Sequence, residues 1–308
     1  MPNEYHKSVL IDAVVEALNV ASVALIADVC LGDGGHAKAL LENAPHLKVI
    51  GIDQDAQAVD RASERLTEFG SRFVPVHGNF RDLALLLNSV SVQHVDGIVA
   101  DLGVSMLQIT HPARGFMFSE DGPLDMRMNP IEQHETAEDV VNELDEKELA
   151  DIIYQYGEER QSRRIARYIT AERQKNRIHG TKQLADIVRK AVGERFVIKS
   201  LARVFQALRI YINHELENLE FFLDQSLAVL NHGGRLAVID YHSLEAKIVK
   251  RFIQREEEPC ICPKDIPVCV CGRQPRLKFV HKLVKPSAEE IDQNPSARSA
   301  RLRVAEKL

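Results

Sequence analysis

The sequence predicts an α/β fold, a doubly wound parallel sheet that is interrupted by an inserted helical domain. Apolar runs typical of buried strands alternate with helical segments near the N-terminus, and this alternation favours a parallel sheet covered on both faces. The alternation stops over residues 106–213, where helical segments follow one another, and a strand returns at residues 235–240. We therefore expect one discontinuous domain, residues 1–105 and 214–308, and an inserted helical domain, residues 106–213.

Each element is expected from its local pattern. Short apolar runs predict strands at residues 23–29, 48–53, 72–77, 95–101, 235–240 and 300–305. Helical spacing predicts helices at residues 36–43, 56–69, 139–156, 161–175, 181–192 and 200–214. Thr181 and Ser200 are plausible N-caps for the last two helices.

Composition limits the classes of protein that fit. The chain has 308 residues, 45% of them hydrophobic, with a net charge of −6, so it can form an ordinary core and global disorder is excluded. It lacks an apolar run of about 18 residues, so we expect no membrane-spanning helix and no membrane partner. Its N-terminus has no signal-peptide pattern, and its five cysteines are an odd number. We therefore expect a reducing, cytoplasmic location.

Positive charge is concentrated in the insertion. Residues 151–210 hold fourteen Lys or Arg against six Asp or Glu, a local balance of +8. Arg160, Arg163, Arg164 and Arg167 fall on one face of the expected helix, as phosphate binding would require. The alternative is a solvated helix face that nearby glutamates neutralise in part.

A glycine-rich loop follows the first strand. Gly32 begins a G-x-G-x-x-A pattern, and Asp53 lies 21 residues further on, at the end of the second strand. This Rossmann-like fingerprint serves both dinucleotides and S-adenosylmethionine, because an acid binds the ribose of each. Asp28 and Asp33 would repel a pyrophosphate and suit an ammonium and a sulfonium, so we favour S-adenosylmethionine over a dinucleotide oxidoreductase.

Polar residues follow the other strands, where ligands bind in open α/β sheets. Asn79 could bond an adenine edge, and Phe80 could pack on its face or belong to the core. Asp101 ends the fourth strand and points to the centre of the cleft. Amino-methyltransferases carry an Asp/Asn-Pro-Pro-aromatic motif here; this chain has the acid but lacks the rest, so Asp101 could orient an amine or hold the cofactor.

About ten motifs in order closely resemble the bacterial 16S ribosomal RNA N4-cytosine methyltransferase family, also called RsmH or MraW. The resemblance runs from His6 to the C-terminus. The motifs are Asp28–His36, Gly51–Asp55, His77–Phe80, Asp101–Ser105, Arg114–Phe116, Asp121–Met128, Tyr156–Arg160, Phe205–Ile210, Asn213–Leu216, His242–Glu245 and Asn294–Ser299.

The resemblance implies methyl transfer from S-adenosylmethionine to N4 of a cytidine in the decoding region of 16S rRNA. The partner would be 16S rRNA or the small ribosomal subunit, gripped by the inserted helical domain, and a homodimer stays open. The family's cofactor positions fall on Gly34, Gly35, His36, Asp53, Phe80, Asp101 and Gln108. Departures occur near Ser8, at Met106 and at Tyr241, where proline, serine and phenylalanine are more usual. A non-catalytic RNA-binding protein with the same fold is the remaining rival.

Other charged residues each allow two interpretations. His242 could orient the base or accept its proton, or could be a structural histidine beside Ser243 as N-cap. Arg114, Asp125 and Arg127 could form a lid or RNA clamp, or a structural ion-pair network. Six C-terminal basic residues could contact phosphates or be solvated: Lys278, Lys282, Lys285, Arg298, Arg301 and Arg303.

Four cysteines form a C-x-C-x6-C-x-C pattern. Cys260, Cys262, Cys269 and Cys271 could bind structural Zn²⁺ or remain reduced or redox-labile thiols. The resemblance requires no metal, so we assign none to the catalytic site. We expect Cys30 to be a small packing residue.

Overall fold

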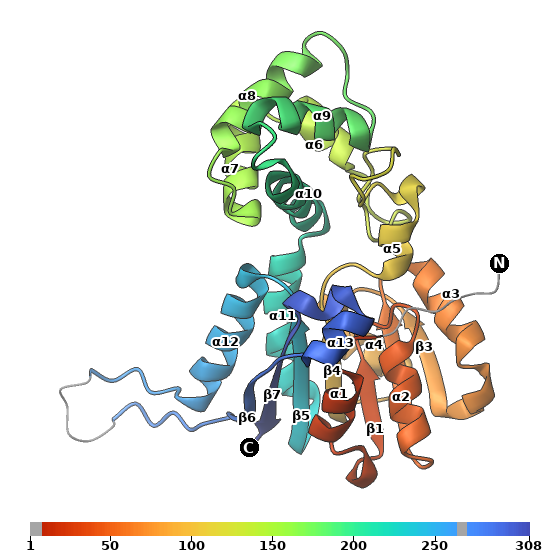
Figure 1. The fold of residues 1–308 in the computed structure, drawn as a ribbon. Helices are drawn as coiled ribbons and strands as arrows, with labels where there is room; N and C mark the ends of the chain where they lie inside the picture. Colours follow the sequence, from red (N-terminus) through yellow and green to blue (C-terminus); the bar gives the residue numbers. More distant parts are fainter. Residues whose placement is uncertain (1–7, 264–269) are drawn as a thin grey trace. The chain divides into compact units, whose positions relative to one another are not determined.

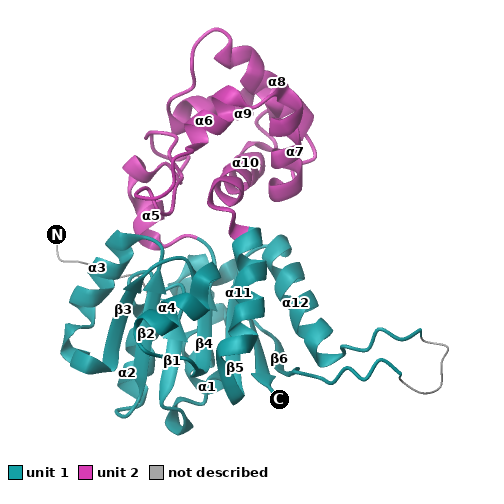
Figure 2. Cartoon of the chain, turned by 180° about the vertical axis from the view of Figure 1, so that it is seen from behind, with its two compact units in different colours: residues 1–103, 216–308 teal, residues 104–215 magenta. Residues whose placement is uncertain are grey.

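The computed structural model describes residues 8–263 and 270–308. It divides the chain into two compact units, residues 1–103 with 216–308, and residues 104–215 (Figure 2). His6, where the family resemblance begins, and Cys269 lie outside the described residues. Within the described ranges, no helix has both the length and the apolar composition to cross a lipid bilayer.

The first unit contains a seven-stranded sheet with helices on both faces (Figure 1). The strands are β1 (Leu25–Asp28), β2 (Lys48–Asp53), β3 (Phe73–His77), β4 (Val95–Asp101), β5 (Leu230–Asp240), β6 (Leu277–Val284) and β7 (Arg301–Lys307). Their order is β3-β2-β1-β4-β5-β7-β6. The predicted doubly wound α/β class is confirmed.

The sheet is mixed, whereas the apolar runs predicted a parallel one. Strands β1 to β5 pair in parallel, but β7 is antiparallel to both of its neighbours, β5 and β6. An apolar strand buried on both faces has the same composition in either direction, so the pattern could not reveal the reversal.

The helices of the first unit cover the two faces of the sheet. They are α1 (Ile11–Ala17), α2 (Gly35–Asn43), α3 (Ala56–Arg65), α4 (Leu83–Ser89), α11 (Glu215–Val229), α12 (Ser243–Glu257) and α13 (Ala288–Gln293). One core cluster joins α1, α2 and α3 to the sheet, and a second joins α4, α11 and α12 to the other face. Along β4, Val99 belongs to the first cluster and Ile98 and Ala100 to the second, as the two-residue period of a strand requires. Burial on both faces therefore explains the unbroken apolar runs.

The second unit is helical and has its own core. Its helices are α5 (Met106–Thr110), α6 (Ala137–Glu143), α7 (Glu146–Gly157), α8 (Ser162–Arg173), α9 (Thr181–Val192) and α10 (Val197–Asn213). Its buried apolar residues come chiefly from α6 to α10. Short 3-10 helices occur in both units: η1 (Val20–Ser22), η2 (Thr67–Arg72), η3 (Phe80–Asp82), η4 (Pro112–Arg114) and η5 (Pro295–Ser299).

Four expected helices differ in the structure. The helix predicted at 56–69 ends at Arg65, and the 3-10 helix η2 follows it. The helix predicted at 139–156 is two helices, because Asp145 forms a capping box with Glu148 and starts α7 afresh. Gly180, not Thr181, is the N-cap of α9. Helix α10 begins at Val197, and Ser200 lies inside it, where its buried hydroxyl donates to Glu159 at 2.9 Å.

Candidate functional site

Three carboxylates lie at the carboxyl ends of neighbouring parallel strands. Asp28 ends β1, Asp53 ends β2 and Asp101 ends β4. β1 lies between β2 and β4 in the sheet, and the chain winds outward in opposite directions from β1 and β4. In doubly wound sheets this reversal opens the ligand crevice, so the acids predicted from the sequence share one edge of the sheet.

The glycine loop after β1 is held against β2. Asp53 accepts hydrogen bonds from the backbone N–H of Gly32 at 2.8 Å and of Asp55 at 2.9 Å. Gly34 has a φ of +74°, a left-handed value that favours glycine, and α2 begins at the next residue. A Cβ at Gly35 would lie 2.0 Å from Ser8 Oγ, so a larger residue would displace Ser8. Glycine is therefore favoured at position 34 by the left-handed turn and at position 35 by the close packing of Ser8.

Asp28 is fully buried, and its carboxylate lacks strong hydrogen-bond donors. Neither of its carboxylate oxygens has a well-formed hydrogen bond within the described residues, and the Cys30 amide gives only weak support. Burial raises its pKa to about 6; His36 opposes this shift and Asp101 adds to it. An ionised carboxylate in such a place calls for a cationic ligand group.

Asp53 has a similar pKa for a related reason. Burial raises its pKa to about 6, although the amides of Asp55 and Gly32 stabilise the charged form. Each carboxylate oxygen has two lone pairs, so acceptor capacity remains beyond these two amides. Asp53 can therefore hold the loop and still accept from the hydroxyls of a ribose.

Asp33 does not act as we expected. Its carboxylate pairs with Arg61 at 3.0 Å, and its carbonyl accepts from Arg65 at 2.9 Å. Its charge is thus largely neutralised within the first unit, and it cannot repel a pyrophosphate as argued from the sequence. The electrostatic preference for a cationic ligand rests on Asp28 instead.

Asp101 belongs to a polar group at the switch point. Its Oδ1 accepts from the Tyr241 hydroxyl at 2.7 Å, and its Oδ2 lies 3.7 Å from Nδ1 of His36. His36 is buried, and its Nε2 lies 2.9 Å from the Val9 carbonyl. Burial and the Asp101 charge raise the pKa of Tyr241, so its phenol keeps the proton that it donates. The hydrogen bond from Tyr241 orients the Asp101 carboxylate, and His36 lies beside it without a hydrogen bond to it.

Sequence reasoning did not find this role for Tyr241, which stood out only as a departure from phenylalanine. Its position in the sequence could have indicated this role, because Tyr241 follows directly after β5, and β5 pairs with β4 up to Asp101. Side chains that follow neighbouring parallel strands meet at the same edge of the sheet.

Phe80 and Asn79 lie in the turn after β3. Phe80 is partly buried and meets Phe222 edge-on, with ring centroids 5.2 Å apart. Phe80 therefore belongs in part to the core, which was one of the two interpretations of the sequence. Part of its side chain remains exposed. Asn79 caps η3 and donates to Gln54 Oε1 at 2.9 Å. Its amide is thus already engaged, which weakens the idea that it reads an adenine edge.

His242 and Gln108 both serve as helix-capping residues. His242, not Ser243, is the N-cap of α12, and its Nε2 lies 3.2 Å from Glu245 Oε1. Gln108 lies in the second unit, where it is buried and completes a capping box with Ser105. Their predicted roles, catalytic for His242 and cofactor-binding for Gln108, remain predictions.

The residues proposed as a lid or clamp form a structural network. Arg127 makes a bidentate pair with Asp125, at 2.8 and 2.7 Å. Arg114 donates to the carbonyls of Arg127 and Met128 at 3.0 and 3.2 Å. These bonds satisfy backbone groups of the loop before α6, so they favour the structural interpretation.

Two of the C-terminal basic residues face an acid rather than solvent. Arg303 is buried and bonds to the buried Asp240, and Arg301 lies 3.5 Å from the same carboxylate. Antiparallel pairing places Arg301 directly opposite Asp240. The expected phosphate contacts of these two arginines are therefore replaced by an internal ion-pair group. Lys278 likewise pairs with Glu306 at 2.8 Å.

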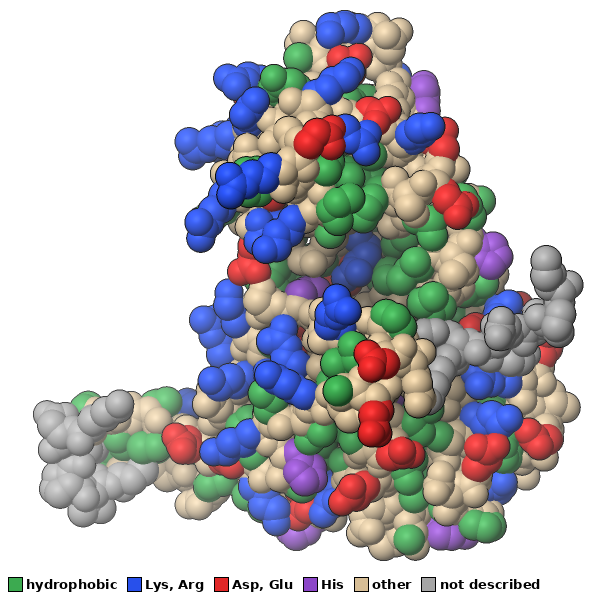
Figure 3. Space-filling view, in the orientation of Figure 1, with side chains coloured by type: hydrophobic (Ala, Val, Ile, Leu, Met, Phe, Trp, Pro, Cys, Tyr) green, Lys and Arg blue, Asp and Glu red, His purple; other side chains and the backbone are tan. Residues whose placement is uncertain are grey.

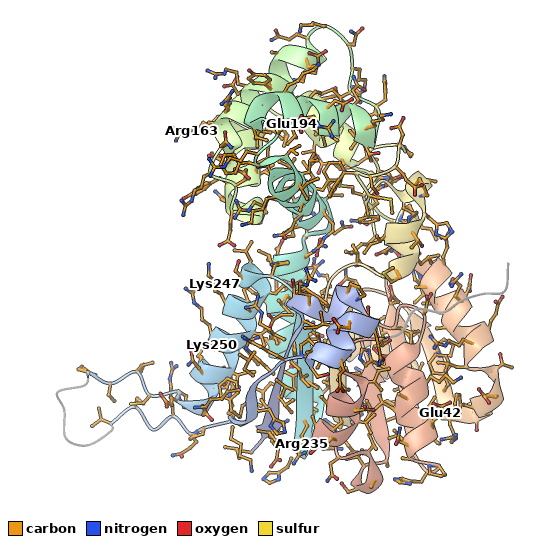
Figure 4. All side chains as sticks on the ribbon, viewed as in Figure 1. Glu42, Arg163, Glu194, Arg235, Lys247 and Lys250 are labelled. Carbon is orange, nitrogen blue, oxygen red and sulfur yellow. The ribbon has the colours of Figure 1, made fainter. Side chains whose placement is uncertain are left out.

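The arginines around the start of α8 are exposed, and Lys and Arg side chains gather on the surface of this part of the second unit in Figure 3. Arg160, Arg163, Arg164 and Arg167 are all exposed, and no described carboxylate lies within 4.0 Å of them. Arg163 points away from the helices in Figure 4. The alternative of a partly neutralised face loses support, because Glu159 is buried beside Arg203 and Glu172 pairs with Lys175. Arg160 precedes α8 and the other three lie on it; we call these four arginines the α8 basic face.

Comparison with known proteins gives full-length matches. The model of the MraW methylase family matches residues 3–308. The chain is 47% identical over 306 residues to "Ribosomal RNA small subunit methyltransferase H" of Carboxydothermus hydrogenoformans, covering 98% of each chain. It is also 47% identical to the protein of the same name from Thermomicrobium roseum, covering 98% of this chain and 94% of the relative. Similarity to solved structures is lower: TrmN from Thermus thermophilus gives a TM-score of 0.44 at 14% identity, covering 97% of this chain and 48% of that one.

The family match agrees with the resemblance found in the sequence. It confirms the predicted enzyme class, a methyltransferase that takes its methyl group from S-adenosylmethionine. The rival dinucleotide oxidoreductase is thereby set aside. The chain belongs to the MraW methylase family.

Proposed function

We propose that this protein transfers a methyl group from S-adenosylmethionine to N4 of a cytidine in the decoding region of 16S rRNA. The observation that carries the proposal is the convergence of Asp28, Asp53 and Asp101 at the switch point of the sheet. Relatives at 47% identity are named as methyltransferases of small-subunit ribosomal RNA, and this supports the substrate class. The family resemblance of the motifs supports the base and the atom.

The residues of the site fit S-adenosylmethionine. Asp28 offers a buried negative charge for the ammonium group of the methionine part. Asp53 offers acceptors for the ribose, and the left-handed Gly34 turns the chain into α2, where the family resemblance places the cofactor. Phe80 offers the remaining exposed area of its ring to the adenine. When bound, the cofactor supplies an electrophilic methyl group on a sulfonium.

The reaction requires orientation more than strong acid–base catalysis. The cytidine N4 lone pair is conjugated with its ring, so the amine is a weak nucleophile and must be aimed at the methyl carbon. One N–C bond forms, one S–C bond breaks, and one N4 proton leaves. We assign Asp101 as the acceptor that orients the amine, because the Tyr241 hydroxyl holds its carboxylate in place.

Asp101 is preferred to His242 as the acceptor of the departing proton. The Nδ1 of His242 accepts from the Glu245 amide at 3.4 Å, and its Nε2 faces the Glu245 carboxylate. The Nδ1 lone pair is therefore used by the helix cap, whereas Nε2 is buried and forms no hydrogen bond within the described residues. We assign His242 to positioning the start of α12.

The second unit would hold the RNA through the α8 basic face. Four exposed arginines without neighbouring carboxylates offer a run of positive charge for phosphates. The target cytidine must leave its stack before its amine can reach a buried sheet edge. Binding of the flanking phosphates would offset part of the free-energy cost of that unstacking.

A methyl-transfer assay tests the function. Purified protein and radiolabelled S-adenosylmethionine are added to small ribosomal subunits from cells that lack the activity, and the nucleosides are separated. We expect label in N4-methylcytidine. Label in another nucleoside would contradict the assignment of base or atom. No label with cofactor binding intact would favour the rival, a non-catalytic RNA-binding protein; free 16S rRNA, tested in parallel, shows whether the subunit is the required form.

A further inference from the structure

Three cysteines come together outside the catalytic site. Cys260 and Cys262 follow α12, and Cys271 lies shortly before β6. Their sulfur atoms all lie within 4.8 Å of one another. The two described parts of this segment run beside each other away from the sheet in Figures 1 and 2.

Hydrophobic packing does not explain this convergence. Ile261 is 66% exposed and Val270 is 81% exposed, so the apolar neighbours of the cysteines face solvent. Cys260 is itself exposed. A short segment without a core is commonly held by a cross-link or a metal ion.

The distances fit a metal better than a disulfide. Cys260 Sγ and Cys271 Sγ are 3.9 Å apart, whereas a disulfide bond is about 2.05 Å long. Thiolates bound tetrahedrally to Zn²⁺ at about 2.3 Å are about 3.8 Å apart. The backbone N–H of Val270 also donates to Cys262 Sγ at 3.4 Å, as outer-sphere donors do around thiolate ligands. Three sulfurs that converge, rather than two, also favour coordination.

We propose that Cys260, Cys262 and Cys271 bind one Zn²⁺ ion as thiolates, and that this ion ties the chain leaving α12 to the chain entering β6. Sulfur ligands select thiophilic ions such as Zn²⁺ over Mg²⁺ and Ca²⁺. Binding releases the thiol protons and involves no oxidation. The proposal rests on these three residues and is independent of the proposed methyl transfer.

Metal analysis of the full-length protein tests the site. The protein is purified under reducing conditions, supplied with equimolar Zn²⁺, desalted and measured by elemental mass spectrometry. We expect one zinc per chain, falling to near zero in Cys260→Ser and in Cys271→Ser. Cys30→Ala is the matched control, because Cys30 lies in the loop after β1, and burial together with Asp53 raises its pKa and disfavours a thiolate. It should keep one zinc.

A second measurement needs no variant. Cobalt is exchanged into the wild-type protein, and its absorption spectrum is recorded. Sulfur-to-cobalt charge-transfer bands with intense visible bands would support tetrahedral thiolate ligation. A protein that holds no zinc, serine variants that keep it, a cobalt spectrum without sulfur bands, or a disulfide between these cysteines in the reduced protein would each overturn the proposal.

Discussion

The buried environment of Asp28 is costly to the fold. Its pKa of about 6 exceeds the ordinary value of 3.8, so between these values the folded chain holds a proton that the unfolded chain has lost. Stability contributed by this group is therefore present below pH 4 and is lost as the pH rises through 6. At pH 7 the buried carboxylate costs about 3 kcal/mol. Such a cost suits a residue kept for binding a cation.

Replacing Asp28 by asparagine separates stability from binding. We expect Asp28→Asn to stabilise the ligand-free protein at pH 7 by about 1–3 kcal/mol, since a neutral amide is cheaper to bury. The gain in unfolding temperature should shrink at pH 4. S-adenosylmethionine affinity should fall about tenfold or more in calorimetry, because the ammonium loses its partner.

The exposed Asp60 on α3 provides the matched control, and Asp60→Asn should change neither property. A destabilised Asp28→Asn protein with unchanged affinity would contradict the role given to Asp28.

Asp53 is expected to control cofactor binding. Asp53→Ala removes acceptors for the ribose and also frees the Gly32 amide. Charged hydrogen bonds contribute about 1.5–3 kcal/mol each, so the affinity should fall by about 100-fold. Isothermal calorimetry measures it, with circular dichroism as a check of folding. Unchanged affinity would exclude Asp53 from the cofactor site.

Asp101 is expected to act on the rate of transfer. Asp101→Asn should lower kcat by about 100-fold with less than a tenfold change in cofactor affinity, as loss of a positioned acceptor does. Tyr241→Phe keeps the ring and removes only the hydroxyl that bonds Asp101, so it should change kcat by less than tenfold. Single-turnover kinetics separate these effects. An Asp101→Asn protein that mainly loses cofactor affinity would move Asp101 from the amine to the cofactor.

At the scale of elements, strands were easier to predict than their directions and partners. Residues 48–53 and 95–101 form strands with the predicted bounds, because a run of buried apolar residues is a local signal. β6 was not predicted, since its residues are mostly half-buried or exposed and lack a clear apolar run. The break between α6 and α7 depends on the cap formed by Asp145, which interrupts a continuous helical pattern.

For the candidate site, too, the positions of residues along the chain were predictable, but their contacts with other elements were not. Asp28, Asp53 and Asp101 stand at strand ends, which a sequence reveals. The partners of Asp33 and Asp101 could not be predicted, because Arg61 and Tyr241 come from other elements. Gln108 entered only through the family resemblance.

The α8 basic face is expected to act in RNA binding alone. Changing Arg163, Arg164 and Arg167 to Glu should weaken binding to small subunits and reduce the salt slope of log K by about 2, at roughly 0.7 per lost phosphate contact. The matched Lys variant keeps the charges and should keep most of the affinity. Filter binding at several salt concentrations measures both.

Cofactor affinity should be unchanged in both α8 variants. A Glu variant that loses cofactor and RNA binding equally would indicate misfolding. A Glu variant with full RNA affinity would show that the phosphates bind elsewhere.

At the scale of the molecule, the two units carry charges of opposite sign at their candidate binding surfaces. The net charge is −6, yet residues 151–210 carry a balance of +8. The acids at the strand ends belong to the first unit and the α8 basic face belongs to the second. A local basic surface can attract RNA to a protein that is acidic as a whole. Composition alone would have given no sign of a nucleic-acid substrate.

The most direct test of the central claim is to locate the methyl group. Small subunits that lack the modification are incubated with the protein and S-adenosylmethionine, and the decoding-region fragment of 16S rRNA is sequenced by tandem mass spectrometry. We predict one added methyl group, on the base of a single cytidine in that fragment, formed about 100-fold more slowly with Asp101→Asn. A methyl group on another base, on a ribose or elsewhere in the rRNA would contradict the account.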